Sequence, residues 1–110
     1  FLTHVAEVQR FVKEVASPGV GLHLDAGGMR LTGESPSDAE PLLPVHYHIS
    51  EPQLSPLGTD PELPHAVWMQ AVAGRGYRGW YSVEMRQPTE NWSEHLEQVL
   101  TRVKSLLPTG

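Results

Sequence analysis

Three short stretches of the sequence hold the residues best suited to acid–base or metal chemistry. VHYHISEP contains His46 and His48 two residues apart, VGLHLD ends in Asp25, and WYSVE ends in Glu84. Carboxylates and imidazoles bind divalent metal ions and exchange protons near neutral pH. If the fold brings the ends of these stretches together, Asp25, His48 and Glu84 form a candidate metal site.

All three stretches have the pattern of β-strands, and we expect strands over residues 20–25, 44–50 and 79–85. Because successive side chains of a strand point to opposite faces, His46 and His48 share one face. Each strand then has one apolar face and one face that is polar near its C-terminal end. The apolar face is expected to be buried under helices and consists of Val20, Leu22, Leu24, Val45, Tyr47, Ile49, Tyr81 and Val83.

Apolar residues at helical spacing and helix-start signals surround these strands. The first helix is expected to begin with Thr3 as its N-cap, and Gly27 and Gly28 are expected to close the first strand. The order of helix, strand, helix, strand, helix, strand and helix predicts an α/β fold with parallel strands. The expected helices cover residues 3–16, 35–43, 63–76 and 90–107.

The distribution of polar residues distinguishes two kinds of parallel sheet. An open sheet covered by helices on both sides has two apolar faces. A (β/α) barrel has helices outside only, and its active sites lie at the C-terminal ends of the strands. The polar strand ends at Asp25, His48 and Glu84 therefore favour a barrel. His46 lies one layer deeper and is expected to be a neighbour rather than a ligand. His23 points to the same inner face, but a structural layer of polar side chains explains this position as well as a role in the site does.

The composition excludes several classes of protein. The chain has 110 residues, no cysteine and a formal net charge of −5 at pH 7, which fits one domain with one modest core. A cysteine-free chain without a signal-peptide profile is expected in the cytoplasm. Scattered lysine and arginine residues argue against nucleic acid as a partner, and no apolar run is long enough to span a membrane.

At these residues the sequence resembles the sugar phosphate isomerase/epimerase family of xylose isomerase-like TIM barrels. VGLHLDAGGM is similar to the family's sixth strand, which ends in a metal-binding aspartate, here Asp25. VHYHISEP is similar to the seventh strand, whose second histidine binds metal, here His48. GRGYRGWYSVEM is similar to an eighth strand that ends in glutamate, here Glu84. The resemblance implies that residues 1–110 are the C-terminal part of an α/β (β/α) barrel: one helix followed by the last three parallel strand–helix units of the full barrel. It also implies that these residues belong to a longer chain.

The resemblance also implies proton transfer next to a carbonyl group of a sugar or polyol, assisted by a divalent metal ion (Mn, Mg, Co or Zn). Asp25, His48 and Glu84 are the implied ligands, and Glu84 is also the implied catalytic acid–base residue. Near the same edge, Glu51 and Arg86 are predicted to contact the substrate. Many members have a histidine three residues after the aspartate, where this chain has glycine, and the family's first metal-binding glutamate has no counterpart here.

Two other functions compete with this prediction. The first is action on nucleic acid by an enzyme with the same metal residues, as in endonuclease IV. That class favours basic loops, whereas this chain is acidic. The strands missing from the barrel favour a partial barrel without catalysis, acting as a binding or assembly unit. Because exposed strand edges recruit partners, we expect the chain to self-associate or to bind the missing N-terminal part of the barrel.

Overall fold

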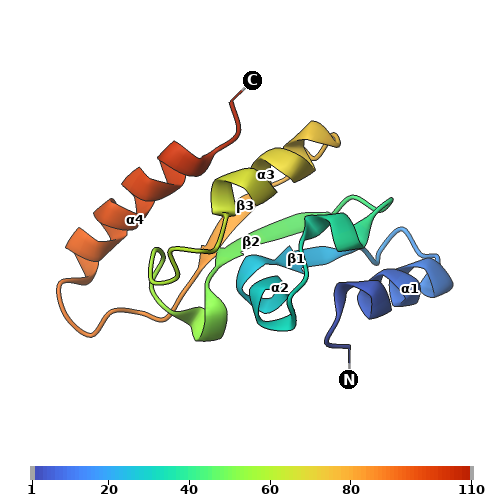
Figure 1. Cartoon of the computed structure of the whole chain (residues 1–110), viewed down its shortest axis with the longest axis horizontal. Helices are drawn as coiled ribbons and strands as arrows, with labels where there is room; N and C mark the ends of the chain where they lie inside the picture. Colours follow the sequence, from blue (N-terminus) through green and yellow to red (C-terminus); the bar gives the residue numbers. More distant parts are fainter. Residues whose placement is uncertain (1, 110) are drawn as a thin grey trace.

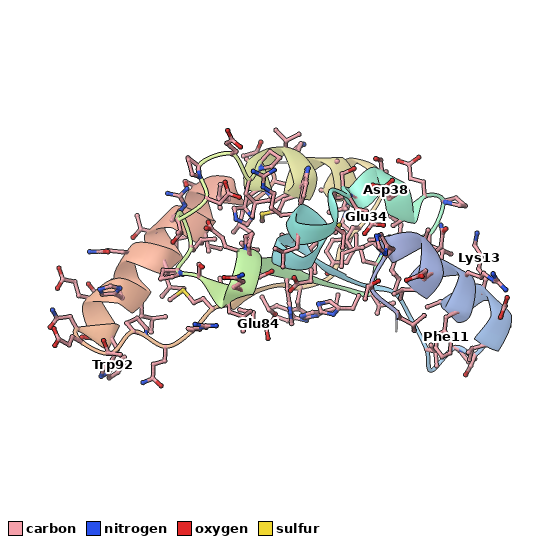
Figure 2. All side chains as sticks on the ribbon, turned by 60° about the horizontal axis from the view of Figure 1, so that its bottom comes forward. Phe11, Lys13, Glu34, Asp38, Glu84 and Trp92 are labelled. Carbon is pink, nitrogen blue, oxygen red and sulfur yellow. The ribbon has the colours of Figure 1, made fainter. Side chains whose placement is uncertain are left out.

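A three-stranded parallel sheet in the order β1-β2-β3 forms the centre of the computed structural model, which describes residues 2–109. Helices cover one face of the sheet and leave the other face open (Figures 1 and 2). This arrangement confirms the predicted α/β partial barrel. The elements are α1 (Val5–Val15), β1 (His23–Asp25), α2 (Ala26–Thr32), β2 (His46–Ser50), α3 (His65–Gly74), β3 (Tyr81–Glu84) and α4 (Trp92–Leu106), with 3₁₀ turns at Pro36–Ala39 and Pro52–Leu54.

All three strands are shorter than predicted, and in each of them the first residues of the predicted segment lie outside the paired region. Pairing begins at His23 and His46. Before that point the side chain of Val45 packs on the backbone of Gly21, where a Cβ atom would lie 2.5 Å from a methyl carbon of Val45. Val20 and Val45 precede the paired region and have 38% and 66% of their surface exposed. The predicted burial of these two valines is therefore wrong.

The central part of the predicted apolar face does form the core. Leu22, Leu24, Tyr47 and Ile49 are almost fully buried. Each such aliphatic side chain contributes about 1.5–3 kcal/mol through its burial. The strand residues pack with helix residues and with partly buried neighbours on β3, namely Met29, Met69, Val72, Tyr81 and Val83. The helices thus lie on this face, as the alternation of the strands predicted.

A helix that the sequence did not predict follows β1 directly. Gly27 and Gly28 lie in the first turn of α2, and Asp25 is its N-cap. The low helix propensity of glycine hides this helix from the sequence pattern. Gly27 is required by packing, since a Cβ atom there would lie 2.5 Å from the carbonyl oxygen of Glu51. Its N–H also donates to Oγ of Ser50 at 2.9 Å, so α2 rests on the end of β2.

Two other helix boundaries differ from prediction. The helix expected after α2 is only the 3₁₀ turn Pro36–Ala39. It ends because Glu40 precedes Pro41 and is extended (φ −62°, ψ 143°), as residues before proline usually are. The N-cap of α1 is His4 rather than Thr3.

The apolar stripes of the first and last helices are only partly covered. On α4, Val99 is buried, whereas Trp92, Leu96 and Leu100 are exposed. Phe11 on α1 is also exposed. Within residues 2–109, no helix has the length and apolar character that crossing a membrane requires.

Candidate metal centre

The polar ends of the three strands meet at one edge of the sheet. In the parallel register Asp25 lies opposite His48, and Ser50 lies opposite Glu84. Figure 2 shows Glu84 on the side of the sheet away from the helices. The structure therefore brings the three predicted ligands together on the open face.

His48 lies between two carboxylates. Its Nδ1 atom is 3.0 Å from Oε2 of Glu84 and 3.7 Å from Oδ2 of Asp25. Two atoms that bind one ion at about 2.1 Å each lie roughly 3.0–3.4 Å apart in octahedral or tetrahedral geometry. All three side chains are partly exposed, so small molecules can reach them. The distances from His48 to each carboxylate and the nitrogen and oxygen donors suit a divalent metal ion, whose binding stays a prediction. Glu84 is nevertheless outside the group of described residues whose ligand atoms all lie within 4.8 Å of one another.

The carboxylate of Asp25 is held in place by the start of α2. Its Oδ1 atom accepts a hydrogen bond from the N–H of Gly28 at 2.6 Å, while Oδ2 is the atom nearest His48. A carboxylate at an N-cap satisfies a free backbone N–H and is stabilised by the helix dipole. The unpredicted helix thus orients a predicted ligand.

Three histidine rings pack together on the open face. The ring centroid of His48 is 4.1 Å from that of His23 and 5.0 Å from that of His46. Ligand atoms of His23, Asp25 and His48 all lie within 4.8 Å of one another. Desolvation lowers the pKa of His23 and the neighbouring His48 lowers it further, which favours the neutral ring, the form that offers a nitrogen lone pair to a metal ion. Sequence reasoning did not choose His23, although its shared strand face with Asp25 was the available signal.

Comparison with protein families matches residues 1–103 to the xylose isomerase-like TIM barrel family. The chain belongs to this family. The match confirms the resemblance noted at the three strand motifs. No curated protein matches the chain.

Membership of the xylose isomerase-like TIM barrel family explains the open face. In a (β/α) barrel the face away from the helices is the interior, and its C-terminal end is the mouth where active sites lie. Asp25, His48 and Glu84 lie at that end. Trp80, directly before β3, is 81% exposed here, as an interior side chain is when the sheet is open.

Glu51, predicted to contact substrate, is directed away from the open face. It is almost fully buried, and its carboxylate accepts hydrogen bonds from the N–H groups of Gly58 and Asp60, the latter at 2.6 Å. Its Oε1 atom is 3.6 Å from Nε2 of His65, a buried ring whose nitrogens have no hydrogen-bond partner among the described residues. Glu51 therefore organises the loop after β2, and its contact with substrate stays a prediction.

Arg86, the other residue predicted to contact substrate, follows β3 at the edge that holds the candidate centre. Its side chain is exposed, and its backbone N–H donates to the carbonyl oxygen of Leu54 at 2.9 Å. This bond ties the segment after Glu84 to the loop after β2. The guanidinium group is free to approach an anionic substrate, and that role stays a prediction.

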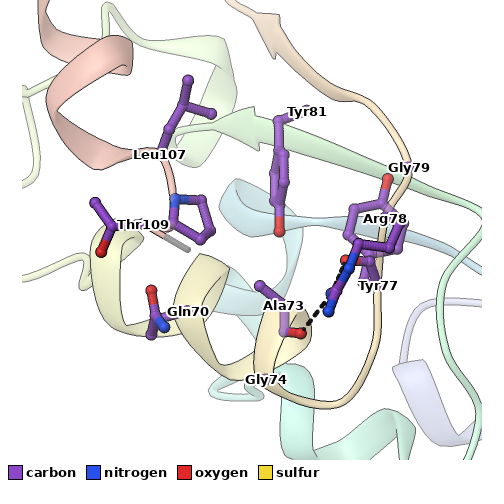
Figure 3. Close-up of a pocket in the computed structure, with 10 residues that line it drawn as sticks. Gln70, Ala73, Gly74, Tyr77, Arg78, Gly79, Tyr81, Leu107 and Thr109 are labelled. Carbon is purple, nitrogen blue, oxygen red and sulfur yellow. Dashed lines mark hydrogen bonds between the residues drawn. The ribbon is translucent and has the colours of Figure 1, made fainter.

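A pocket of about 430 Å³ lies at the N-terminal end of β3, opposite the candidate centre (Figure 3). Its lining includes Gln70, Tyr81 and Leu107. Arg78 borders it and donates to the carbonyl oxygen of Ala73 at 2.9 Å. Because active sites of (β/α) barrels lie at the C-terminal ends of the strands, this pocket is not the candidate active site.

Proposed function

We propose that this chain contributes the metal-binding edge of an isomerase or epimerase that acts on a sugar or polyol in carbohydrate metabolism. The observation that carries the proposal is the place of His48 Nδ1 between the carboxylates of Asp25 and Glu84, at the C-terminal ends of barrel strands. The family match supports this type of fold. The proposed reaction is proton transfer next to a carbonyl group, and the cysteine-free composition is in keeping with a cytoplasmic enzyme.

The three residues at the strand ends have different parts in this reaction. Asp25, His48 and Glu84 would hold a divalent ion (Mn²⁺, Mg²⁺, Co²⁺ or Zn²⁺), which supplies positive charge that stabilises negative charge on substrate oxygen atoms. Glu84 is the proposed catalytic residue, because its exposed carboxylate can take the proton from the carbon next to the carbonyl group and return it. His48 Nδ1 lies 3.0 Å from Oε2 of Glu84 and holds that carboxylate at the strand end; when an ion is bound, this hydrogen bond would be replaced by bonds from both groups to the ion.

Two residues beyond the strands are proposed to recognise the substrate. Arg86 lies two residues after Glu84 and presents a planar group that pairs well with phosphate or carboxylate. Glu51 lies three residues after His48, and because its carboxylate is buried and bonded to the backbone of Gly58 and Asp60, the proposed contact with substrate would require the carboxylate to leave those bonds. We expect small sugars or polyols rather than nucleic acid, because the chain has a net charge of −5.

Proton exchange in D₂O tests the proposed reaction. The chain is incubated with Mn²⁺ and a panel of ketoses and aldoses, and proton NMR follows the C–H signal next to the carbonyl group. We expect exchange faster than with Mn²⁺ alone, and a rate lowered roughly 10²-fold by Glu84→Gln. Glu94→Gln, which changes an exposed glutamate on α4, is the matched control and should leave the rate unchanged. Exchange no faster than the Mn²⁺ blank contradicts the proposal.

A binding or assembly unit without catalysis is the second candidate, and the open sheet favours it. Among the described residues β1 and β3 are edge strands, and Trp80 next to β3 is exposed. Unpaired edges and exposed apolar surface recruit partners, so the proposed partner is a second copy of the chain or the rest of the barrel. Stable assembly together with no proton exchange would favour this candidate.

A further inference from the structure

We propose that His23 is a further metal ligand, which gives the centre two imidazoles and directs it toward Zn²⁺ or Co²⁺ rather than Mg²⁺. This inference rests on the proposed function and adds to it one ligand and a metal preference. It starts from the packing of His23 against His48 on the open face of the sheet.

The position of His23 makes it a neighbour of the predicted ligands. It shares a strand face with Asp25, and the register pairs it with His46, one layer below the pair formed by Asp25 and His48. Residues two apart on a strand are separated by about 6.6 Å, so a side chain from the deeper layer must lean toward the strand end to share an ion. His23 does so, because a ring nitrogen lies within 4.8 Å of ligand atoms of both Asp25 and His48.

His46 has the same depth in the sheet but does not join this group. In residues 2–109 the cluster with metal-ligand spacing consists of His23, Asp25 and His48. The ring of His46 also lies farther from His48, at 5.0 Å between centroids compared with 4.1 Å for His23. His23 and His46 are paired across β1 and β2, but only His23 belongs to the cluster. Substitution of His46 is therefore a matched control for substitution of His23.

A movement of the side chains closes the cluster around one ion. Two ligand atoms of a tetrahedral ion lie about 3.4 Å apart when each bond is roughly 2.1 Å long. The atoms of the cluster lie within 4.8 Å of one another, so they must approach by up to about 1.4 Å. His23 is exposed, and its ring can rotate without displacing the core.

A second imidazole changes which ions the centre prefers. Imidazole suits Zn²⁺, Co²⁺, Ni²⁺ and Cu²⁺, whereas carboxylate and water suit Mg²⁺ and Mn²⁺. Asp25, His48 and Glu84 alone offer one nitrogen donor among carboxylate oxygens. The cluster of His23, Asp25 and His48 offers two imidazoles and one carboxylate. Glu84 lies outside the cluster but contacts His48 Nδ1 at 3.0 Å, and it is the proposed fourth ligand of a tetrahedral Zn²⁺.

X-ray absorption at the zinc edge tests the inference, because it counts imidazole ligands without requiring activity. The chain, His23→Phe and His46→Phe are each loaded with an equimolar amount of Zn²⁺. We expect two imidazoles in the wild-type chain and in His46→Phe, and one in His23→Phe. In calorimetric titrations, His23→Phe should weaken Zn²⁺ binding by roughly 10–100-fold or more and leave Mg²⁺ binding unchanged.

The outcomes separate this inference from the proposed metal centre. Zn²⁺ bound through a single imidazole in the wild-type chain, or equal loss of affinity in both phenylalanine variants, overturns the role of His23 and leaves the centre standing. No Zn²⁺, Co²⁺ or Mn²⁺ bound by the wild-type chain overturns the centre itself, and His23 with it. Circular dichroism checks that each variant keeps its fold, and His23→Gln replaces His23→Phe if phenylalanine disturbs the sheet.

Discussion

Replacing Glu51 with glutamine tests whether this residue organises the loop after β2. The carboxylate accepts one hydrogen bond on each oxygen, from the backbone N–H groups of Gly58 and Asp60. Glutamine has nearly the same size, but its amide offers one oxygen and one NH₂ group. One backbone N–H therefore faces another donor in Glu51→Gln, and the remaining bond loses its charge assistance.

The expected loss of stability follows from these two changes. A hydrogen bond to a charged group contributes about 1.5–3 kcal/mol, and a buried donor left without a partner costs about 1–3 kcal/mol. Because the loop can relax, we expect a net loss of about 2 kcal/mol in the free energy of unfolding. An unfolding entropy of about 2.1 cal/mol/K per residue, over 110 residues, converts this loss to a Tm lower by roughly 9 °C.

Thermal melting followed by circular dichroism measures this effect, at pH 7, at one protein concentration and with a chelator present so that metal binding does not contribute. Glu62→Gln is the control, because Glu62 belongs to the same loop and its side chain is 79% exposed. The control should change Tm by no more than about 2 °C. An unchanged Tm in Glu51→Gln refutes the loop-organising role, and weaker substrate binding at that unchanged Tm would support the predicted substrate contact.

Three further predictions follow from the packing and the charges. Burial lowers the pKa of His65, so the unfolded chain binds a proton at this residue more readily than the folded chain does. Stability should therefore fall as the pH drops below about 6.5. The slope of Tm against pH in this range should be smaller in His65→Leu than in the wild-type chain. Gly27→Ala forces a Cβ atom against the backbone of Glu51 and should lower stability by about 1–3 kcal/mol, whereas Gly74→Ala meets open space at the end of α3 and should be neutral or stabilising in the same melting assay. The open sheet edges should drive self-association at low micromolar concentration, and a sharp monomer in sedimentation with a cooperative melt contradicts that expectation.

The strand positions and their faces could be predicted because they depend on a strong local signal. Alternation of apolar and polar residues placed Leu24, Tyr47 and Ile49 in the core and His48 on the opposite face. The predicted ligands also meet, since parallel strands end at a common edge and the register places Asp25 opposite His48.

The features that were missed depend on contacts between distant segments. Gly27 lies in a helix because α2 packs against the backbone of Glu51, and nothing in the local sequence shows that contact. Glu51 is buried because the backbone of its own loop turns back to it. Val45 is exposed because the sheet begins after it, a boundary that alternation alone does not mark.

Metal content per chain tests the central claim most directly, and elemental analysis of purified chains loaded with Mn²⁺ or Co²⁺ measures it. We predict that His48→Ala removes the bound ion, because Nδ1 of His48 lies between the carboxylates of Asp25 and Glu84. We predict that His46→Ala keeps the ion and loses only stability, because His46 lies one layer deeper and outside the cluster with ligand spacing. Metal retained in His48→Ala and lost in His46→Ala would show that His46, and not His48, is the ligand. Metal content unchanged in both variants would contradict a metal centre at this edge.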